Sequence, residues 1–360
     1  MTTTKSSALI AGLAFAFLVS SAIAEESAYR RSLTESAMKE GFGRSEVEKL
    51  SIAATSNRSK TAERLREQAS SGAFGKLLTF TFDKPTQEDD KTLSFVAEEG
   101  YLQIYADGSR FRLRGNIAKA KPVKADGGKE RIEIGRLERL ARGYVQGPLK
   151  EFVVLQDDES LTFLGSRYFR QGGGSVKERT GQEYLVANIA ILGREVDGVP
   201  VVGSGSKIAV WITPDEEILG VDVDWPQYRR GGRSEPLLSR EQLRRRITAA
   251  SVPVENSETV RIARFECGYV DLGATRRKAE TPIQPGCAIY YKGVETNEMR
   301  GVFAREEFVP VGQIVYVDDR WPLATYIARN GEPKPGVAYA LPKVEPPPSD
   351  PLPESPLPKK

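Results

Sequence analysis

The 360-residue sequence contains no histidine and only two cysteines. The missing histidine excludes Ser-His-Asp and Cys-His nucleophile systems, H-E-x-x-H zinc peptidases and every acid–base step that uses an imidazole. Long apolar runs are also missing, since no stretch after residue 24 approaches the length of a transmembrane helix. The net charge of +3 is too small to indicate a nucleic-acid partner, and 39% hydrophobic residues predict a folded chain with a core.

Residues 1–24 have the layout of a secretory signal peptide. Lys5 gives a short positive region, Ala8–Val19 is apolar, and Ala22-Ile23-Ala24 forms an A-x-A cleavage site before Glu25. The apolar stretch is too short for a membrane span. We therefore expect cleavage between Ala24 and Glu25 and a periplasmic or secreted mature chain, with an uncleaved N-terminal anchor as the alternative.

The other end of the chain, residues 332–360, is rich in proline. Ten of these 29 residues are proline, which prevents a regular hydrogen-bonded ladder and predicts a disordered or polyproline II tail. A solvated spacer is the plain interpretation. A tether or a ligand for a proline-recognition domain is the alternative.

Between these ends we predict an α+β fold of tandem modules, each with one helix packed on an antiparallel sheet. The predicted ranges are a helical segment 25–57, a first module 58–116, a central module 134–228 and a third module 236–331. Ala62, Leu65 and Ala69 share one helix face in the first module. Ser239 and Gln242 form a capping box at the start of the third.

The central stretch 184–225 predicts three consecutive strands. Asp197-Gly198 is a hairpin signal, because glycine adopts a positive φ without steric penalty. Val199-Pro200-Val201 is predicted to be extended, since proline disfavours helix at the residue before it. Apolar residues then alternate with Gly220, Asp222 and Asp224, which is the period of a half-buried strand.

This stretch resembles the core of the PepSY and fungalysin/thermolysin-propeptide families. The residues that carry the resemblance are Asp197, Gly198, Val199, Pro200, Val201 and Gly203, and the match is limited to about residues 184–225. It implies small cystatin-like α+β modules in an exported bacterial protein, with a polypeptide or a peptidase as partner. A generic antiparallel hairpin with a D-G turn is the alternative.

The two cysteines are predicted to form a disulfide. Cys267 and Cys287 lie on two neighbouring predicted strands, and the alternation of each strand directs both side chains into the same core if the strands pair. Two cysteines in an exported chain favour a bonded pair. Two free buried thiols are the alternative.

A serine–lysine pattern and a pair of aspartates are the candidate catalytic or metal-binding groups, and the plain interpretation of each is structural. Ser204-Gly205-Ser206-Lys207 matches S-x-x-K, but flanking glycines and a following strand favour a turn over a catalytic serine. Asp222 and Asp224 are two residues apart and so share one strand face. Paired carboxylates suit glycoside hydrolysis or Ca²⁺ binding, whereas the plain interpretation is a solvated strand face.

Two further groups are candidate binding residues. Trp211 and Trp225 either pack in the core or line a groove for peptide or glycan. Arg229, Arg230 and Arg233 lie in a predicted basic linker, and together with Arg244–Arg246 they would make a patch for anionic envelope polymers or lipid headgroups. A solvated surface is the alternative for the arginines.

These observations favour an exported, non-catalytic protein without cofactor or metal that binds a protein or peptide of the cell envelope. Antiparallel edge strands provide a route, because a partner segment can join a sheet as an additional strand. A structural protein of the envelope that uses the proline-rich tail is the second hypothesis. A hydrolase that works with aspartate and glutamate alone is the third.

Overall fold

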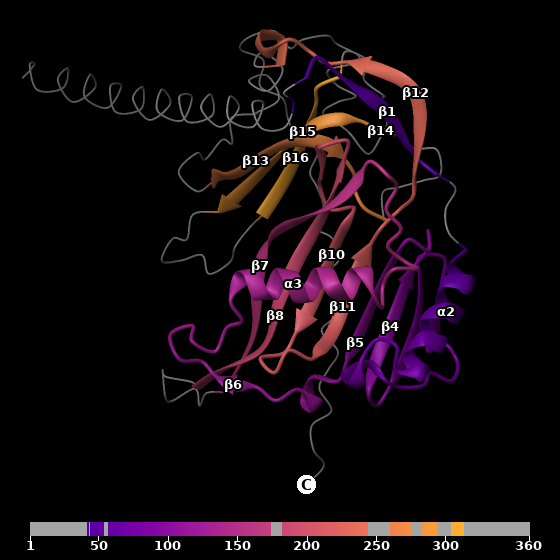
Figure 1. Ribbon diagram of the computed structural model, residues 1–360, viewed down its shortest axis with the longest axis vertical. Coiled ribbons are helices and arrows are strands. Elements are labelled where there is room, and N and C mark those ends of the chain that lie inside the picture. The colour runs from indigo at the N-terminus through magenta and orange to yellow at the C-terminus, as the bar shows by residue number, and fades with distance from the viewer. Residues whose placement is uncertain are drawn as a thin grey trace, which may run out of the picture.

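The computed structural model describes residues 42, 44–53, 57–173, 182–243, 260–274, 282–293 and 304–312. The predicted signal peptide with its Ala24/Glu25 cleavage site, the three arginines 244–246 and the proline-rich tail lie outside these ranges. Among the described residues, no helix combines the length and the apolarity needed to cross a membrane. Figure 1 shows the arrangement of the elements.

The helical elements are α2 (Arg58–Ser71), α3 (Ile134–Gln146) and the short 3₁₀ turns η1 (Lys76–Leu78) and η2 (Ile117–Lys119). The first eight strands are β1 (Glu46–Ile52), β2 (Gln87–Glu88), β3 (Thr92–Ala97), β4 (Gly100–Tyr105), β5 (Arg110–Gly115), β6 (Val123–Lys124), β7 (Glu159–Gly173) and β8 (Gln182–Val196). The later strands are β9 (Val199–Val202), β10 (Lys207–Ile212), β11 (Ile218–Asp224), β12 (Tyr228–Pro236), β13 (Val260–Val270), β14 (Pro282–Ile283), β15 (Pro285–Gly293) and β16 (Ala304–Pro310).

A single large antiparallel sheet dominates the fold. Its strands run in the order β2-β3-β4-β5-β11-β10-β8, and β7 lies on the other side of β8. The predicted tandem modules of one helix each are therefore wrong, because β5 of the first predicted module pairs directly with β11 of the central one. The register explains this pairing: Arg112 lies opposite Asp222 and Arg110 opposite Asp224, and opposite charges across two strands stabilise their contact.

Helices α2 and α3 cover the same face of this sheet (Figure 1). Asn57 caps α2 by accepting from the Lys60 amide, and the helix buries Ala62, Leu65 and Ala69 as the spacing predicts. Helix α3 packs beside it on the strands from β7 to β11, and both helices share one apolar core with the sheet. We call the opposite side of the sheet the open face.

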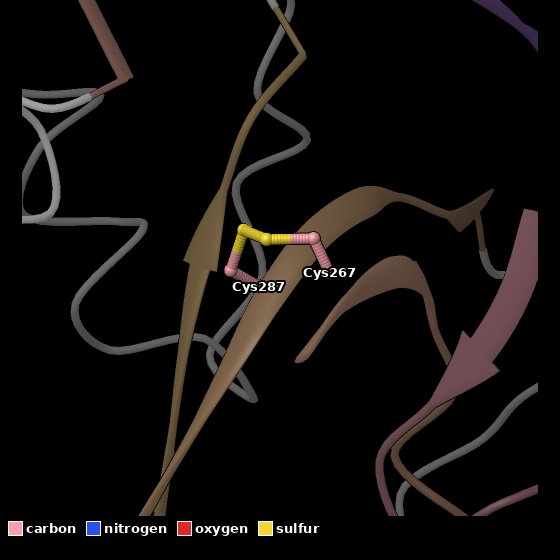
Figure 2. Close-up of a disulfide and its surroundings, with 2 residues drawn as sticks. All are labelled: Cys267 and Cys287. Atoms are coloured by element: carbon pink, nitrogen blue, oxygen red, sulfur yellow. A yellow bond between two sulfur atoms is a disulfide. The ribbon is translucent and has the colours of Figure 1, made fainter. Parts of the chain in front are cut away.

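The last strands form a second layer at one end of the sheet. Antiparallel strands β13, β15 and β16 join the main sheet through β9, which pairs in parallel with β13. The predicted disulfide is confirmed: Cys267 and Cys287 lie directly opposite each other on β13 and β15 and are both buried (Figure 2).

A small sheet with the order β12-β1-β14 packs on this layer, and it differs from two predictions. Strand β1 lies inside segment 25–57, for which the sequence predicts helix. Arg229–Arg233 belong to β12 and not to a linker. Both differences have one cause, since β1 and β12 satisfy each other's backbone groups although neither has a strong apolar pattern of its own.

The capping box is confirmed. The Ser239 amide donates to Gln242 Oε1 over 2.9 Å, and the Gln242 amide donates to Ser239 Oγ over 3.3 Å. The helix that it starts is described as far as Leu243.

Candidate functional site: the edge of strand β7

Strand β7 is the longest edge of the sheet. It has 15 residues, and within the described part of the chain it pairs with β8 alone. The edge at the far side, β3, is by contrast covered by the short strand β2. An edge strand presents a row of backbone N–H and C=O groups to which another chain can bond.

The register shows which β7 residues turn these groups outward. The Asp197 amide donates to the Asp158 carbonyl, so the backbone groups of the odd-numbered residues of β8 from Ala187 to Glu195 face β7. Arg167 and Phe169 pair with such residues and therefore bond to β8. Their neighbours alternate, which leaves the backbone groups of Ser166 and Tyr168 directed away from the sheet.

The N-terminal part of β7, up to Gly165, is not available to an additional strand. Arg142 of α3 donates from Nη1 to the Leu161 carbonyl over 2.8 Å and so satisfies the outward group at that residue. A β-bulge follows at Leu164, where the register shifts between Phe163 and Gly165. Gly165 has a φ of +139°, a value that side chains other than hydrogen rarely permit. The available edge therefore begins after the bulge and continues along Ser166 to Gly172.

On the open face, the apolar side chains of Leu164 and Phe169 border this edge; we call them the apolar ledge. Leu164 is 43% exposed and lies over Gly193, whose missing side chain makes room for it. Phe169 packs on Trp211 with ring centroids 5.5 Å apart. A strand added to β7 would place alternate side chains against this ledge.

On the helix-covered face, charged side chains border the same edge. The Arg131 guanidinium lies 4.3 Å from the centre of the Tyr168 ring. Arg170 forms ion pairs with Glu183 at 2.9 Å and with Glu130 at 3.7 Å. The open face of the edge is therefore apolar except for Arg167, which lies between Leu164 and Phe169, and the helix-covered face is charged.

The motif core Asp197–Gly203 lies at the junction of the two layers. Asp197 and Gly198 both have positive φ and form the predicted hairpin turn between β8 and β9. Val199 and Val201 are buried, and Pro200 pairs with Glu195 of β8. Gly203 approaches the Asp271 backbone so closely that a Cβ would lie 2.5 Å from the carbonyl oxygen. Val199, Val201 and Gly203 thus connect the layers, whereas Asp197 and Gly198 are exposed in the turn, where Asp197 forms an ion pair with Arg44.

The two predicted tryptophans lie on opposite faces of the sheet and do not form one groove. Trp225 is buried beneath the helices and donates from Nε1 to the Val154 carbonyl over 3.1 Å. Trp211 is half-buried on the open face, where the Arg114 guanidinium lies 3.6 Å from its ring centre. Gly220 permits this stacking, since a Cβ there would lie 2.5 Å from Arg114 Cδ.

Asp222 and Asp224 share the open face, as their spacing predicts, but they are not a catalytic pair. Asp222 forms ion pairs with Arg112 and Arg114 of β5. Asp224 is buried and accepts from the Ala274 amide over 3.3 Å. Each carboxylate has a structural partner.

The three predicted linker arginines lie along β12. Arg230 forms ion pairs with Glu48 of β1 and with Asp158 in the turn before β7. Arg229 and Arg233 lie on either side of it, opposite β1 or beside the Gly231-Gly232 bulge. Arg230 therefore fixes β1 to the main sheet.

A buried polar network, which sequence reasoning missed, holds the two layers together. Asp271 Oδ2 accepts from Tyr228 over 2.8 Å and from Ser206 over 3.2 Å, and Oδ1 accepts from the Gly273 amide over 2.9 Å. Gly205 lies against this carboxylate, and a Cβ there would be 2.1 Å from Cγ. Gly203 and Gly205, in the turn before Ser206, were the available signal, because glycine permits a close approach of the backbone to another group.

The S-x-x-K pattern does not form a catalytic pair. Ser204 Oγ donates to the Leu272 carbonyl over 2.7 Å, and Lys207 Nζ donates to the carbonyls of Val201 and Gly205. Both groups bind backbone in the junction between the layers. Within the described ranges, no group of three or more cysteine, aspartate and glutamate residues is placed to hold a metal ion.

Comparisons with known proteins add no function. No family model and no curated protein matches the chain. Among solved structures, an uncharacterized protein from Eubacterium rectale ATCC 33656 is similar, with a TM-score of 0.45 and 12% identity over 79% of this chain and 97% of that one. So distant a likeness carries no argument, and the resemblance to the PepSY and propeptide families stays a prediction.

Proposed function

We propose that this chain is a non-catalytic, exported protein that binds an extended polypeptide segment by adding it as a strand to β7. The observation that carries the proposal is the outward orientation of the backbone groups of Ser166 and Tyr168 on a strand with one described neighbour. Main-chain hydrogen bonds would supply the affinity, and the side chains on either face would supply the selectivity.

The geometry sets the length and the character of the partner segment. The edge from Ser166 to Gly172 matches a segment of about seven extended residues. Alternate residues of the segment would lie against Leu164, Arg167 and Phe169 on the open face, where apolar side chains fit beside Leu164 and Phe169 and an acidic side chain fits beside Arg167. The residues between them would lie near Arg131 and Arg170.

The disulfide supports the compartment in this proposal. Structural disulfides persist in the periplasm and outside the cell, and they are rare in the cytosol. The motif resemblance favours a peptidase as the source of the bound segment.

A proline at position 166 tests strand addition. Because the Ser166 amide points away from β8, Ser166→Pro removes an outward donor and leaves the ladder to β8 intact. We would select peptides of about seven residues from a displayed random library on the wild-type chain, and measure their affinity by titration and the protection of the amides of residues 166 and 168 by hydrogen exchange.

Ser166→Ala is the matched control, since it loses the hydroxyl and keeps the amide. We expect the selected peptides to bind wild type and Ser166→Ala equally, to protect the two amides, and to bind Ser166→Pro at least about tenfold more weakly. Equal binding to Ser166→Pro, at unchanged thermal stability, would refute strand addition at β7.

A further inference from the structure

We propose that the open face of the sheet is a second binding site, which takes an acidic polypeptide segment through the arginines of β5 and Arg167 of β7. This site is separate from strand addition, since it uses side chains on the sheet surface and not the backbone of an edge.

The arginines form a row along β5. Arg110, Arg112 and Arg114 alternate with buried residues, so all three side chains lie on the open face with a repeat of about 6.7 Å. An extended polypeptide presents every second side chain at the same repeat. A segment with alternate carboxylates therefore matches the row.

The three arginines face two carboxylates, Asp222 and Asp224 of β11, so the row keeps one positive charge in excess. Asp222 binds Arg114 and lies 3.6 Å from Arg112 Nε. Arg110 is stacked over Tyr105 with its guanidinium 4.3 Å from the ring centre, and it forms no ion pair within the described residues. The Arg112 side chain is 39% exposed, so its remaining N–H groups face solvent. Guanidinium groups bind carboxylates through two parallel hydrogen bonds.

Arg167 extends the site across the sheet. Arg167 pairs with Ile189 of β8, which pairs with Trp211 of β10. Trp211 pairs in turn with Gly220 of β11, and Gly220 pairs with Arg114, so this line of neighbours runs across the strands from Arg167 to Arg114. Four strand spacings separate β5 from β7, a distance of about 19 Å that about six extended residues span, so a segment that binds the row along β5 reaches Arg167 by turning at Arg114 and crossing the sheet. Arg167 is exposed and has no ion-pair partner among the described residues.

The stacking of the arginines favours a polypeptide over an anionic glycan. Sugar rings bind to open faces of aromatic rings, and here Arg110 covers Tyr105 while Arg114 covers Trp211. The face therefore presents guanidinium N–H groups in place of bare rings, and these groups recognise carboxylates.

The test measures binding of a fluorescein-labelled octaglutamate peptide to the full chain by anisotropy at low ionic strength. We expect saturable binding that Arg110→Gln/Arg112→Gln weakens about tenfold and that Arg167→Gln weakens about threefold, as expected for partly exposed ion pairs. The matched control is Arg64→Gln/Arg139→Gln, which removes two exposed charges from the helices on the opposite face. It should bind like wild type.

Absence of saturable binding, or equal binding by Arg110→Gln/Arg112→Gln and the control, would overturn the proposal. Tighter binding of polygalacturonate, lost in the same variant, would overturn the assignment to a polypeptide. Ser166→Pro should bind octaglutamate like wild type, so a failure of this site and a failure of strand addition give different results.

Discussion

The buried carboxylate of Asp271 should be the most sensitive single position at the junction between the two layers. It accepts from the hydroxyls of Tyr228 and Ser206 and from the Gly273 amide, and its own amide donates to the Val202 carbonyl. Replacing Asp271 by alanine removes the three side-chain bonds. The hydroxyls of Tyr228 and Ser206 lie 2.6 Å apart and can bond to each other, so the Gly273 amide and one hydroxyl proton lose their acceptor in a site without water access.

The magnitude follows from these bonds. A hydrogen bond to a charged group contributes about 1.5–3 kcal/mol, and a donor left buried without a partner costs about 1–3 kcal/mol. Because the effects overlap, we expect Asp271→Ala to lower the free energy of unfolding by about 4–5 kcal/mol. Asp271→Asn retains the shape and one acceptor oxygen, so its loss should be about 1–2 kcal/mol. Tyr228→Phe removes the bond to Asp271 and the contact of 2.6 Å between the hydroxyls of Tyr228 and Ser206, and it should lose about as much.

Urea unfolding followed by circular dichroism measures all three variants. Asp215→Ala, an exposed aspartate in the turn between β10 and β11, is the control and should change the free energy of unfolding by less than about 0.5 kcal/mol. A loss below about 1 kcal/mol for Asp271→Ala would show that the network does not connect the layers. So would equal losses for the alanine and asparagine variants.

Two other perturbations have signs that the structure determines. Cys267→Ser/Cys287→Ser releases a loop with a separation of 20 residues, which the loop-entropy relation converts to about 3 kcal/mol of lost stability; a change below about 1 kcal/mol in urea unfolding would contradict it. Burial raises the pKa of Glu235 to about 7, against a smaller lowering effect of Lys49. The stability linked to this group is therefore present below the unfolded-state pKa of 4.5 and is lost as the pH rises through about 7. The loss of stability is at most about 3 kcal/mol. Glu235→Gln should remove this pH dependence, which urea unfolding at acidic and alkaline pH measures. Equal pH dependence of wild type and Glu235→Gln would count against the assignment to Glu235.

The sequence predicts local features better than pairings between distant segments. The α2 face, the capping box at Ser239, the D-G turn and the disulfide each depend on residues within one or two elements. The contact between β5 and β11 joins residues about a hundred positions apart, and the alternation of apolar residues within either strand does not identify the strand that it pairs with. The predicted tandem modules were wrong for this reason. The alternate positive charges of Arg110 and Arg112 and the alternate negative charges of Asp222 and Asp224 are the sequence feature that matches this pairing.

The candidate site shows the same limit. Edge binding was predicted as a mode, but the sequence of β7 does not show that it is an edge, because its alternation is the same as that of an inner strand. Trp211 and Trp225 were predicted as a possible groove, and their faces depend on the pairing of β10 and β11 and on the side that the helices cover. Asp271 follows an apolar run and looks like an ordinary turn residue until Tyr228 and Ser206 are placed beside it.

Several features of strand β7 limit, but do not prevent, the pairing of its edge with another chain. Natural edge strands avoid aggregation through bulges, charged side chains or a covering element. Here the bulge at Leu164 and the bond from Arg142 to Leu161 close the first third of the strand. Charged residues Arg167 and Arg170 then flank the remaining outward groups, one on each face. Arg170 is already paired with Glu183 and Glu130, so a second copy of β7 would bring mainly the charges of Arg167 together, whereas a segment with an acidic residue beside Arg167 would neutralise its charge. The charge of Arg167, which opposes self-association, thus favours a foreign strand with an acidic residue at this position.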